Sequence, residues 1–251
     1  MESSDIDITV LYNDVGSDTR LETAHGISCL IEGMEKTVLF DTGGDGHLLL
    51  DNMRKLGKDP ERVDIVIISH LHWDHSGGLF TVLRSTGPVK AFMPKDFPED
   101  FVNHAGRLGA DVTVVDGPIQ IISGLHSTGQ MGNDSLPRDR REQSITLDTA
   151  EGTAVLTGCA HPGIVDIVKR AKDIRPGEIA IALGGFHLKV SDEPAVNGVI
   201  KELRDLGIGK MACSHCTGAI RGPQLGMFQK AWANDFIPFG CGATVKLLQK
   251  Q

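Results

Sequence analysis

This 251-residue sequence lacks an excess of basic charge, a long apolar run and a paired set of cysteines. The 25 lysines and arginines are outnumbered by 33 aspartates and glutamates, and the formal net charge of −8 gives no reason to bind a phosphate backbone. No run approaches the roughly 18 apolar residues of a membrane span, and residues 1–7 lack the basic and apolar regions of a secretory signal. We therefore expect no nucleic-acid partner, no membrane association and a cytoplasmic location.

The cysteines do not form the framework of a small secreted protein. Five cysteines, an odd number, are scattered along the chain, which predicts reduced thiols. Cys213 and Cys216 make a single CxxC pair, and no second pair exists to complete a four-thiolate zinc site. A strand end lined with small residues is the alternative interpretation of this pair.

The apolar pattern predicts an α/β protein. Short β-branched runs bounded by glycine, aspartate and proline indicate buried strands at 6–11, 27–31, 37–40, 65–68, 89–93, 112–115, 119–122, 144–147, 154–156, 179–182 and 211–212. Helical spacing occurs between them at 46–56, 78–85, 98–108, 163–172, 194–206 and 224–234. This alternation favours two packed sheets with helices on both outer sides.

The chain is predicted to be one domain over 1–251, because no Pro-, Gly- or Ser-rich linker divides it. A strand followed by a histidine-bearing turn and a helix occurs near 65–85 and again near 154–172. We therefore expect two similar halves, about 1–125 and 126–251. Residues 129–143 have almost no apolar content and contain a charge run, Arg138 to Glu142, so they predict an exposed loop. The alternative is a lid whose arginines meet an anionic substrate.

A dense cluster of metal-ligand residues follows the predicted strand at 65–68. His70 and His72 alternate by two, so they can point the same way from an extended segment, and Asp74 and His75 fall on the next turn. Sites in α/β proteins gather at such strand ends. Imidazole nitrogen and carboxylate oxygen are ligands for Zn²⁺, and they also suit Fe and Mn.

One loop cannot close two metal spheres, so further ligands must come from elsewhere in the chain. His161 and His215 each follow an apolar strand and precede a turn, and we expect both to be ligands. His187 has a similar setting, and for it a ligand, a substrate-binding residue and a structural residue all remain open. Cys159 lies two residues before His161 and is a competing metal ligand.

Asp41 ends another predicted strand and is followed by Thr42, Gly43 and Gly44. Such an aspartate can accept hydrogen bonds from backbone amides and shape the floor of a site without touching metal. The glycines at 43–46 lack the spacing of a Rossmann or P-loop motif, so they do not predict a nucleotide site.

The motif His70-x-His72-x-Asp74-His75, preceded by Asp41-Thr42-Gly43 and followed by histidines in the second half, resembles the metallo-β-lactamase superfamily. The resemblance spans nearly the whole chain and implies a four-layer αββα sandwich with two metal ions bridged by water or hydroxide. Other segments are similar to the subgroup that contains 7,8-dihydropterin-6-methyl-4-(ribofuranosyl)aminobenzene-phosphate synthase. They are His25-Gly26-Ile27-Ser28, Gly158-Cys159-Ala160-His161-Pro162-Gly163-Ile164-Val165, Gly184-Gly185-Phe186-His187-Leu188 and Ser214-His215-Cys216-Thr217-Gly218.

The sequence departs from the family pattern in its second half. Many members carry Thr-Gly-Asp or Ser-Gly-Asp with a bridging aspartate, whereas here Thr157-Gly158 is followed by Cys159. Either Cys159 takes the bridging place, or His161 alone completes a remodelled sphere. His126 is the residue near the earlier family histidine, and it is an alternative ligand.

These observations predict an enzyme with two divalent metal ions, Zn first and Fe or Mn as alternatives. The first expectation is hydrolase-type chemistry by metal-bound hydroxide, with Asp74 as ligand and proton acceptor and with Asp74 or His187 moving the proton. A transferase similar to the dihydropterin synthase and a non-catalytic metal or ligand sensor are the alternatives. We expect a small, anionic substrate, and a homodimer remains open.

Overall fold

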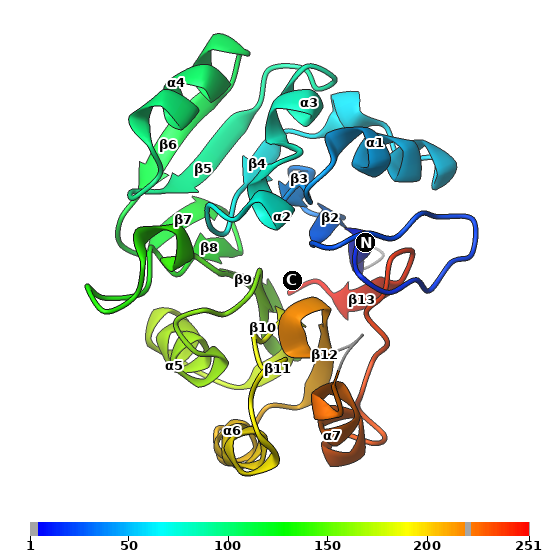
Figure 1. Cartoon of the computed structure of the whole chain (residues 1–251), viewed down its shortest axis with the longest axis vertical. Coiled ribbons are helices and arrows are strands. Elements are labelled where there is room, and N and C mark those ends of the chain that lie inside the picture. Colours follow the sequence, from blue (N-terminus) through cyan, green and yellow to red (C-terminus); the bar gives the residue numbers. More distant parts are fainter. Residues whose placement is uncertain (1–4, 219–221, 251) are drawn as a thin grey trace.

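The protein is a sandwich of two β-sheets, each covered on its outer side by helices (Figure 1). The structure is a computed structural model that describes residues 5–218 and 222–250, so residues 1–4 of the N-terminal segment lie outside it. The seven strands of the first sheet, in spatial order, are β13 (Thr244–Leu248), β1 (Asp5–Tyr12), β2 (Ser28–Glu32), β3 (Val38–Phe40), β4 (Ile65–Ile67), β5 (Lys90–Pro94) and β6 (Asp111–Val115). The six of the second are β12 (Lys210–Ser214), β11 (Ile179–Gly185), β10 (Gly152–Thr157), β9 (Ile145–Thr149), β8 (Leu125–Ser127) and β7 (Ile119–Ile122).

The helices separate into two outer layers. The helices of the first layer are α1 (Gly46–Lys55), α3 (Leu79–Leu83) and α4 (Glu99–Arg107). The short helix α2 (Trp73–Ser76) lies at the site. The helices of the second layer are α5 (Ile164–Ile174), α6 (Glu193–Asp205) and α7 (Gln224–Ala231). The short 3₁₀ helices are η1 (Pro60–Arg62), η2 (Arg138–Arg140) and η3 (His215–Thr217). The predicted α/β class and αββα architecture are confirmed.

Strand alternation explains why the four layers hold together. Along β4, Ile65 and Ile67 pack between the sheets, whereas Val66 packs under the helices of the first layer. Along β11, Ile181 packs between the sheets, whereas Ala182 packs under the helices of the second layer. Successive side chains of a strand point to opposite faces. Strands buried on both faces therefore appear in the sequence as continuous apolar runs.

Parallel pairing sets the place of the site. β3, β4, β5 and β6 run parallel in the first sheet, and β10, β11 and β12 run parallel in the second. Parallel neighbours end at the same edge of their sheet, so the segments that follow them gather there. β13, from the end of the described chain, pairs antiparallel with β1. The internal duplication of the two halves stays a prediction.

The loop at 129–143 differs in part from the prediction. Asn133 to Ser135 and Arg138 to Arg140 are exposed, as expected, but Glu142 and Gln143 are fully buried. The prediction of an exposed loop was therefore wrong at its C-terminal end, because tertiary hydrogen bonds satisfy these polar side chains in the interior. Among the described residues, no helix is long and apolar enough to cross a membrane.

Candidate metal centre

Segments that follow four strands bring the predicted ligands together. Residues 70–75 follow β4, Cys159 and His161 follow β10, His187 follows β11, and His215 follows β12. Asp14, which the sequence analysis did not single out, follows β1. The site therefore lies where the ends of both sheets meet.

His70, His72 and His161 form the first of two candidate ligand sets. Their ring centroids lie 4.7 Å apart for His70 and His72, 4.8 Å for His70 and His161, and 4.9 Å for His72 and His161. The Nε2 atoms of His70 and His161 are buried and have no hydrogen-bond partner among the described residues. Buried polar atoms are rarely left unpaired, so these two nitrogens indicate a ligand between the rings.

Asp74, His75 and His215 form a second ligand set. Asp74 Oδ2 lies 3.4 Å from His75 Nε2 and 3.4 Å from His215 Nε2. Cys159 Sγ lies 3.2 Å from His75 Nε2 and 3.4 Å from His215 Nε2. Donor atoms of His70, Cys159 and His161 also fall within 4.8 Å of one another. The Cys159 sulfur therefore belongs to both sets.

Asp41 orients the histidines that follow β4. Its Oδ2 accepts hydrogen bonds from His75 Nδ1 at 2.7 Å and from Ser69 Oγ at 2.7 Å, and Ser69 Oγ lies 2.9 Å from His70 Nδ1. Its Oδ1 accepts from the Ser69 backbone N–H at 2.6 Å. With Nδ1 held in this way, each ring presents Nε2 to the centre, which is the usual arrangement around histidine ligands. The expectation that Asp41 binds a backbone amide and shapes the floor of the site is confirmed.

Asp14 performs the same task for His215. Its carboxylate pairs with His215 Nδ1 through Oδ2 and with His25 Nδ1 through Oδ1, the latter at 2.6 Å. His25 Nε2 in turn lies 3.3 Å from Asp74 Oδ2. The position of Asp14 directly after a predicted strand was the signal in the sequence that could have revealed it.

Glu142 holds the loop that carries Cys159. Its Oε1 accepts hydrogen bonds from the backbone N–H groups of Gly158, Cys159 and Ala160 at 3.1, 2.9 and 3.0 Å, and its Oε2 accepts from that of His161 at 3.0 Å. The side chain is fully buried. Glu142 belongs to a charge run, Arg138 to Glu142, that predicts exposure, so no sequence signal indicates this role.

Backbone strain is concentrated at the site. Asp41, Ala160, His187 and His215 are the non-glycine residues with positive φ in the described chain, at +57°, +57°, +49° and +53°. All four are in or beside the ligand-bearing turns. Left-handed backbone is costly for residues other than glycine and clusters at functional sites, where the surrounding structure enforces it.

Burial and neighbouring charge shift the protonation equilibria of the site. Burial beside other histidines lowers the pKa of His70 well below its usual value, and burial beside His187 lowers that of His161 to about 2. Burial opposes ionisation of Asp74, but its hydrogen bonds to His215 and His75 lower its pKa well below the usual range. The site therefore favours neutral imidazole on His70 and His161 and a carboxylate on Asp74. Metal ions bind these protonation states.

A pocket of about 530 Å³ opens beside the second set. It is lined by Asp14, His25, Lys189, Val190, His215, Cys216 and Gly218. Val190 is 84% exposed, and Trp73, whose ring centroid lies 6.1 Å from that of His25, is 61% exposed. Exposed apolar side chains beside a pocket that also carries polar groups are typical of a surface that receives a ligand.

The arginines of the 129–143 loop differ in their contacts. Arg141 is held by Asp96 and Asp134 at 2.8 and 2.9 Å, so its charge is already paired. Arg140 is exposed, and its charge contributes to lowering the pKa of both His72 and His161, each of which is lowered mainly by burial. Of these two arginines, Arg140 is the one placed to meet an anion at the first ligand set.

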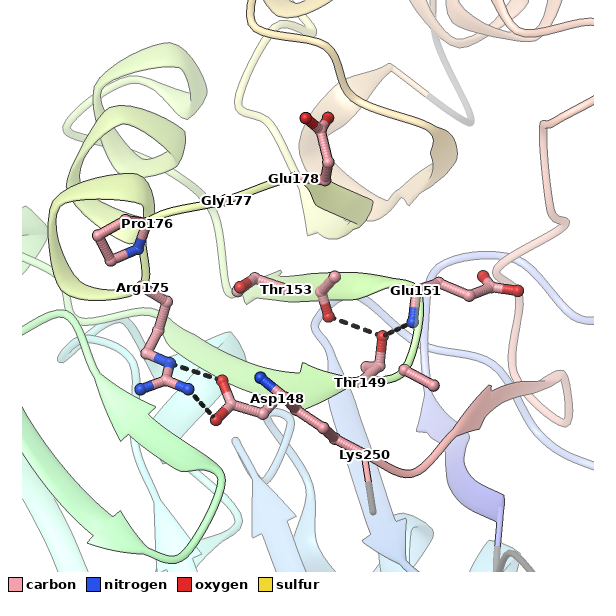
Figure 2. Close-up of a pocket in the computed structure, with 11 residues that line it drawn as sticks. Asp148, Thr149, Glu151, Thr153, Arg175, Pro176, Gly177, Glu178 and Lys250 are labelled. Carbon is pink, nitrogen blue, oxygen red and sulfur yellow. Dashed lines mark hydrogen bonds and ion pairs between the residues drawn. The ribbon is translucent and has the colours of Figure 1, made fainter.

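His126 lies away from both sets. It pairs with Thr146 across β8 and β9, on the face opposite Leu125 and Leu147, which pack between the sheets. Asp148 shares that outer face and pairs with Arg175 at 2.5 Å, beside a separate pocket of about 340 Å³ (Figure 2). The pocket in Figure 2 contains none of the predicted ligands. His126 as an alternative ligand is therefore wrong, because the pleat turns it away from the strand ends that carry the others.

The comparison with known families decides the assignment. The model of the metallo-β-lactamase superfamily matches residues 26–163, more than half of the chain. The chain belongs to the metallo-β-lactamase superfamily. The match begins just before β2 and ends just after His161.

The metallo-β-lactamase protein has relatives that match most of its length. It is 29% identical to the 7,8-dihydropterin-6-methyl-4-(β-D-ribofuranosyl)-aminobenzene-5′-phosphate synthase of Methanocaldococcus jannaschii, over 95% of each chain. It is also 29% identical to an uncharacterised protein of that organism, over 77% of this chain and 84% of the relative. A solved metal-dependent hydrolase of the β-lactamase superfamily is 23% identical, with a TM-score of 0.79 over 97% of this chain and 100% of that chain. The metallo-β-lactamase fold protein YhfI from Bacillus subtilis is 12% identical, with a TM-score of 0.66 over 96% of this chain and 99% of that chain. The two solved structures share the fold.

The donor set of this metallo-β-lactamase site fits divalent metal ions. Two unpartnered buried Nε2 atoms, a carboxylate and a sulfur converge, and the other nitrogen of most of the rings is already hydrogen-bonded. Nitrogen, oxygen and sulfur donors in such mixtures are ligands of Zn²⁺ and of iron.

Proposed function

We propose that the protein is a binuclear metal-dependent enzyme whose two ions are held by His70, His72 and His161 and by Asp74, His75 and His215. The observation that carries this proposal is the pair of adjoining ligand sets that share the Cys159 sulfur. Cys159 takes the place where many relatives have a bridging aspartate. When bound, a pair of divalent ions supplies an activated water nucleophile and polarises a carbonyl or phosphoryl oxygen.

The protein side chains supply orientation and proton handling. Asp41 and Asp14 each hold the Nδ1 atom of a histidine, so that Nε2 remains an acceptor. Asp74 Oδ2 faces the two Nε2 atoms of the second set and, on its other side, His25 at 3.3 Å. A proton released at the centre can therefore pass from Asp74 toward His25 and the pocket. His187 as a proton carrier stays a prediction.

The substrate is proposed to be a small molecule with an anionic group. The pocket beside the second set contains Lys189, and Arg140 stands beside the first set. Neither cation is paired with a carboxylate in the described part of the chain. An anionic group would meet one of these cations while the reacting bond lies between the ligand sets.

Hydrolysis is the first candidate reaction, and metal analysis with a substrate panel tests it. The purified protein should contain bound Zn, Fe or Mn, and it should hydrolyse at least one ester, lactone, thioester or phosphate ester. His70→Ala should lower both metal content and turnover, whereas His126→Ala, on the outer face, should leave both unchanged. A protein that binds no divalent metal after reconstitution would overturn the proposal.

Group transfer is the second candidate, favoured by the relative that covers 95% of each chain and carries a synthase name. In this reaction the amino nitrogen of an aminobenzene ribosyl phosphate would bond to a dihydropterin methylene group, pyrophosphate would leave from that carbon, and the nitrogen would lose a proton. Incubation with dihydropterin pyrophosphate and that acceptor should then yield the joined product and pyrophosphate by mass spectrometry. If the pyrophosphate ester neither binds nor is consumed, the transferase candidate fails and the hydrolase remains.

A further inference from the structure

A third group of ligand atoms lies next to the two sets described above. This group consists of the Sγ atoms of Cys159 and Cys216 and a ring nitrogen of His187. The three atoms lie within 4.8 Å of one another. Both cysteines are almost fully buried. Cys213, three residues before Cys216, belongs to no such group among the described residues. The CxxC pair therefore separates into one cysteine that faces the centre and one that packs in the core of the second helical layer.

Several contacts show that this group is built and not incidental. The backbone N–H of His187 donates to Cys216 Sγ at 3.1 Å, and His187 adopts a left-handed backbone with φ of +49°. The Nδ1 atom of the His187 ring is buried and has no hydrogen-bond partner among the described residues. A Cβ on Gly185 would come 2.5 Å from the Gly158 carbonyl oxygen and 2.7 Å from Cys216 Sγ, so glycine lets both atoms approach the chain there.

We propose that Cys159, His187 and Cys216 form a third metal site, which takes a thiophilic ion such as Zn²⁺ or Fe²⁺. Around a tetrahedral zinc ion, sulfur and nitrogen ligands at about 2.3 and 2.0 Å from the metal are separated by roughly 3.5 Å. The three donor atoms lie within 4.8 Å of one another, so small side-chain rotations bring them to these separations. Two sulfur donors select Zn²⁺ or iron over Mg²⁺, Ca²⁺ or Mn²⁺.

The charges around the centre are consistent with a third cation. Four carboxylates with little exposed surface lie at the centre, those of Asp14, Asp41, Asp74 and Glu142. Binding metal would add the charges of two thiolates, because a coordinating thiol loses its proton. Buried anions need positive partners, and one further divalent ion would balance the charge of these two thiolates. Cys216 also lines the pocket of about 530 Å³, which gives an ion a path from solvent.

The number of metal ions bound per chain tests the third site. The third site rests on the proposed function only through Cys159, which it shares with the two ligand sets. Apoprotein, prepared with a chelator under anaerobic reducing conditions, would be reloaded with Zn²⁺, and bound metal per chain would be measured after gel filtration. Wild type should hold one equivalent more than Cys216→Ser. In a parallel Co²⁺ titration, the last step of the thiolate-to-cobalt absorption should be present in wild type and absent in Cys216→Ser.

Matched variants separate the possible results. Cys213→Ser changes a buried cysteine of the same CxxC pair and should keep the wild-type stoichiometry. Equal stoichiometry in wild type and Cys216→Ser, or an equal loss in Cys213→Ser, overturns the third site while leaving the binuclear centre in place. Should Cys216→Ser fail to fold, His187→Ala decides, with the same loss of one equivalent expected. A wild type that binds no metal contradicts the binuclear function itself.

Discussion

The two halves of the centre are built in different ways. His70, His72, Asp74 and His75 come from one six-residue stretch after β4, and Asp41, which orients them, comes from the neighbouring parallel strand β3. In the second half, the ligands follow two different strands. Their supports lie far away in the sequence, since Asp14 reaches His215 across 201 residues. The four candidate ligands after β4 are thus encoded locally, whereas those of the second half are brought to them by tertiary contacts.

The largest effect is expected where the two halves meet. Asp74→Ala removes a carboxylate that faces both His75 and His215, so turnover should fall by more than the roughly 100-fold typical of supporting residues. The fold should remain, because the side chain is held by site residues and not by the apolar core. Turnover and a thermal melt would be measured together. Full activity in Asp74→Ala would contradict its role in the centre.

The next effect concerns the loop of the second half. Glu142→Ala leaves four backbone N–H groups without their acceptor in the interior, and each unsatisfied buried donor costs about 1–3 kcal/mol. Both the melting temperature and the metal content should fall. Glu142→Gln retains one acceptor oxygen and should lose less, whereas Glu151→Ala, at an exposed hairpin, should change neither. A stable, fully metal-loaded Glu142→Ala would show that Cys159 and His161 are positioned without it.

The layers, which are confirmed, and the four candidate ligands after β4, which stay a prediction, follow from the sequence for physical reasons. Apolar runs identify buried strands, and a dense run of ligand residues leaves few structural explanations. Glu142 was missed because local composition in a charge run indicates exposure, whereas its burial depends on N–H groups from a segment that follows β10. His126 was offered as a ligand because position in the chain does not reveal which way a strand side chain points.

A smaller effect compares the two supporting carboxylates. Asp41→Asn should weaken metal binding at both sets, since Asp41 contacts His75 directly and His70 through Ser69. Asp14→Asn should weaken only the set that contains His215. Losses of about 10- to 100-fold in affinity are expected for such supports. Stepwise metal titration would resolve them. If Asp14→Asn also weakens the binding step of the set that contains His70, the two ligand sets are not independent.

The smallest effect is expected at the rim of the first set. Arg140→Gln should raise KM for an anionic substrate by roughly 2- to 5-fold and leave kcat unchanged, since an exposed ion pair contributes up to about 1 kcal/mol. Arg138→Gln is the matched control, because Arg138 belongs to the same 3₁₀ helix and its charge is not among those that shift His72 or His161. Raised ionic strength should reproduce the effect in wild type and diminish it in Arg140→Gln. Equal KM values for the two variants would place the anionic group of the substrate at Lys189 instead, in the pocket beside the second ligand set.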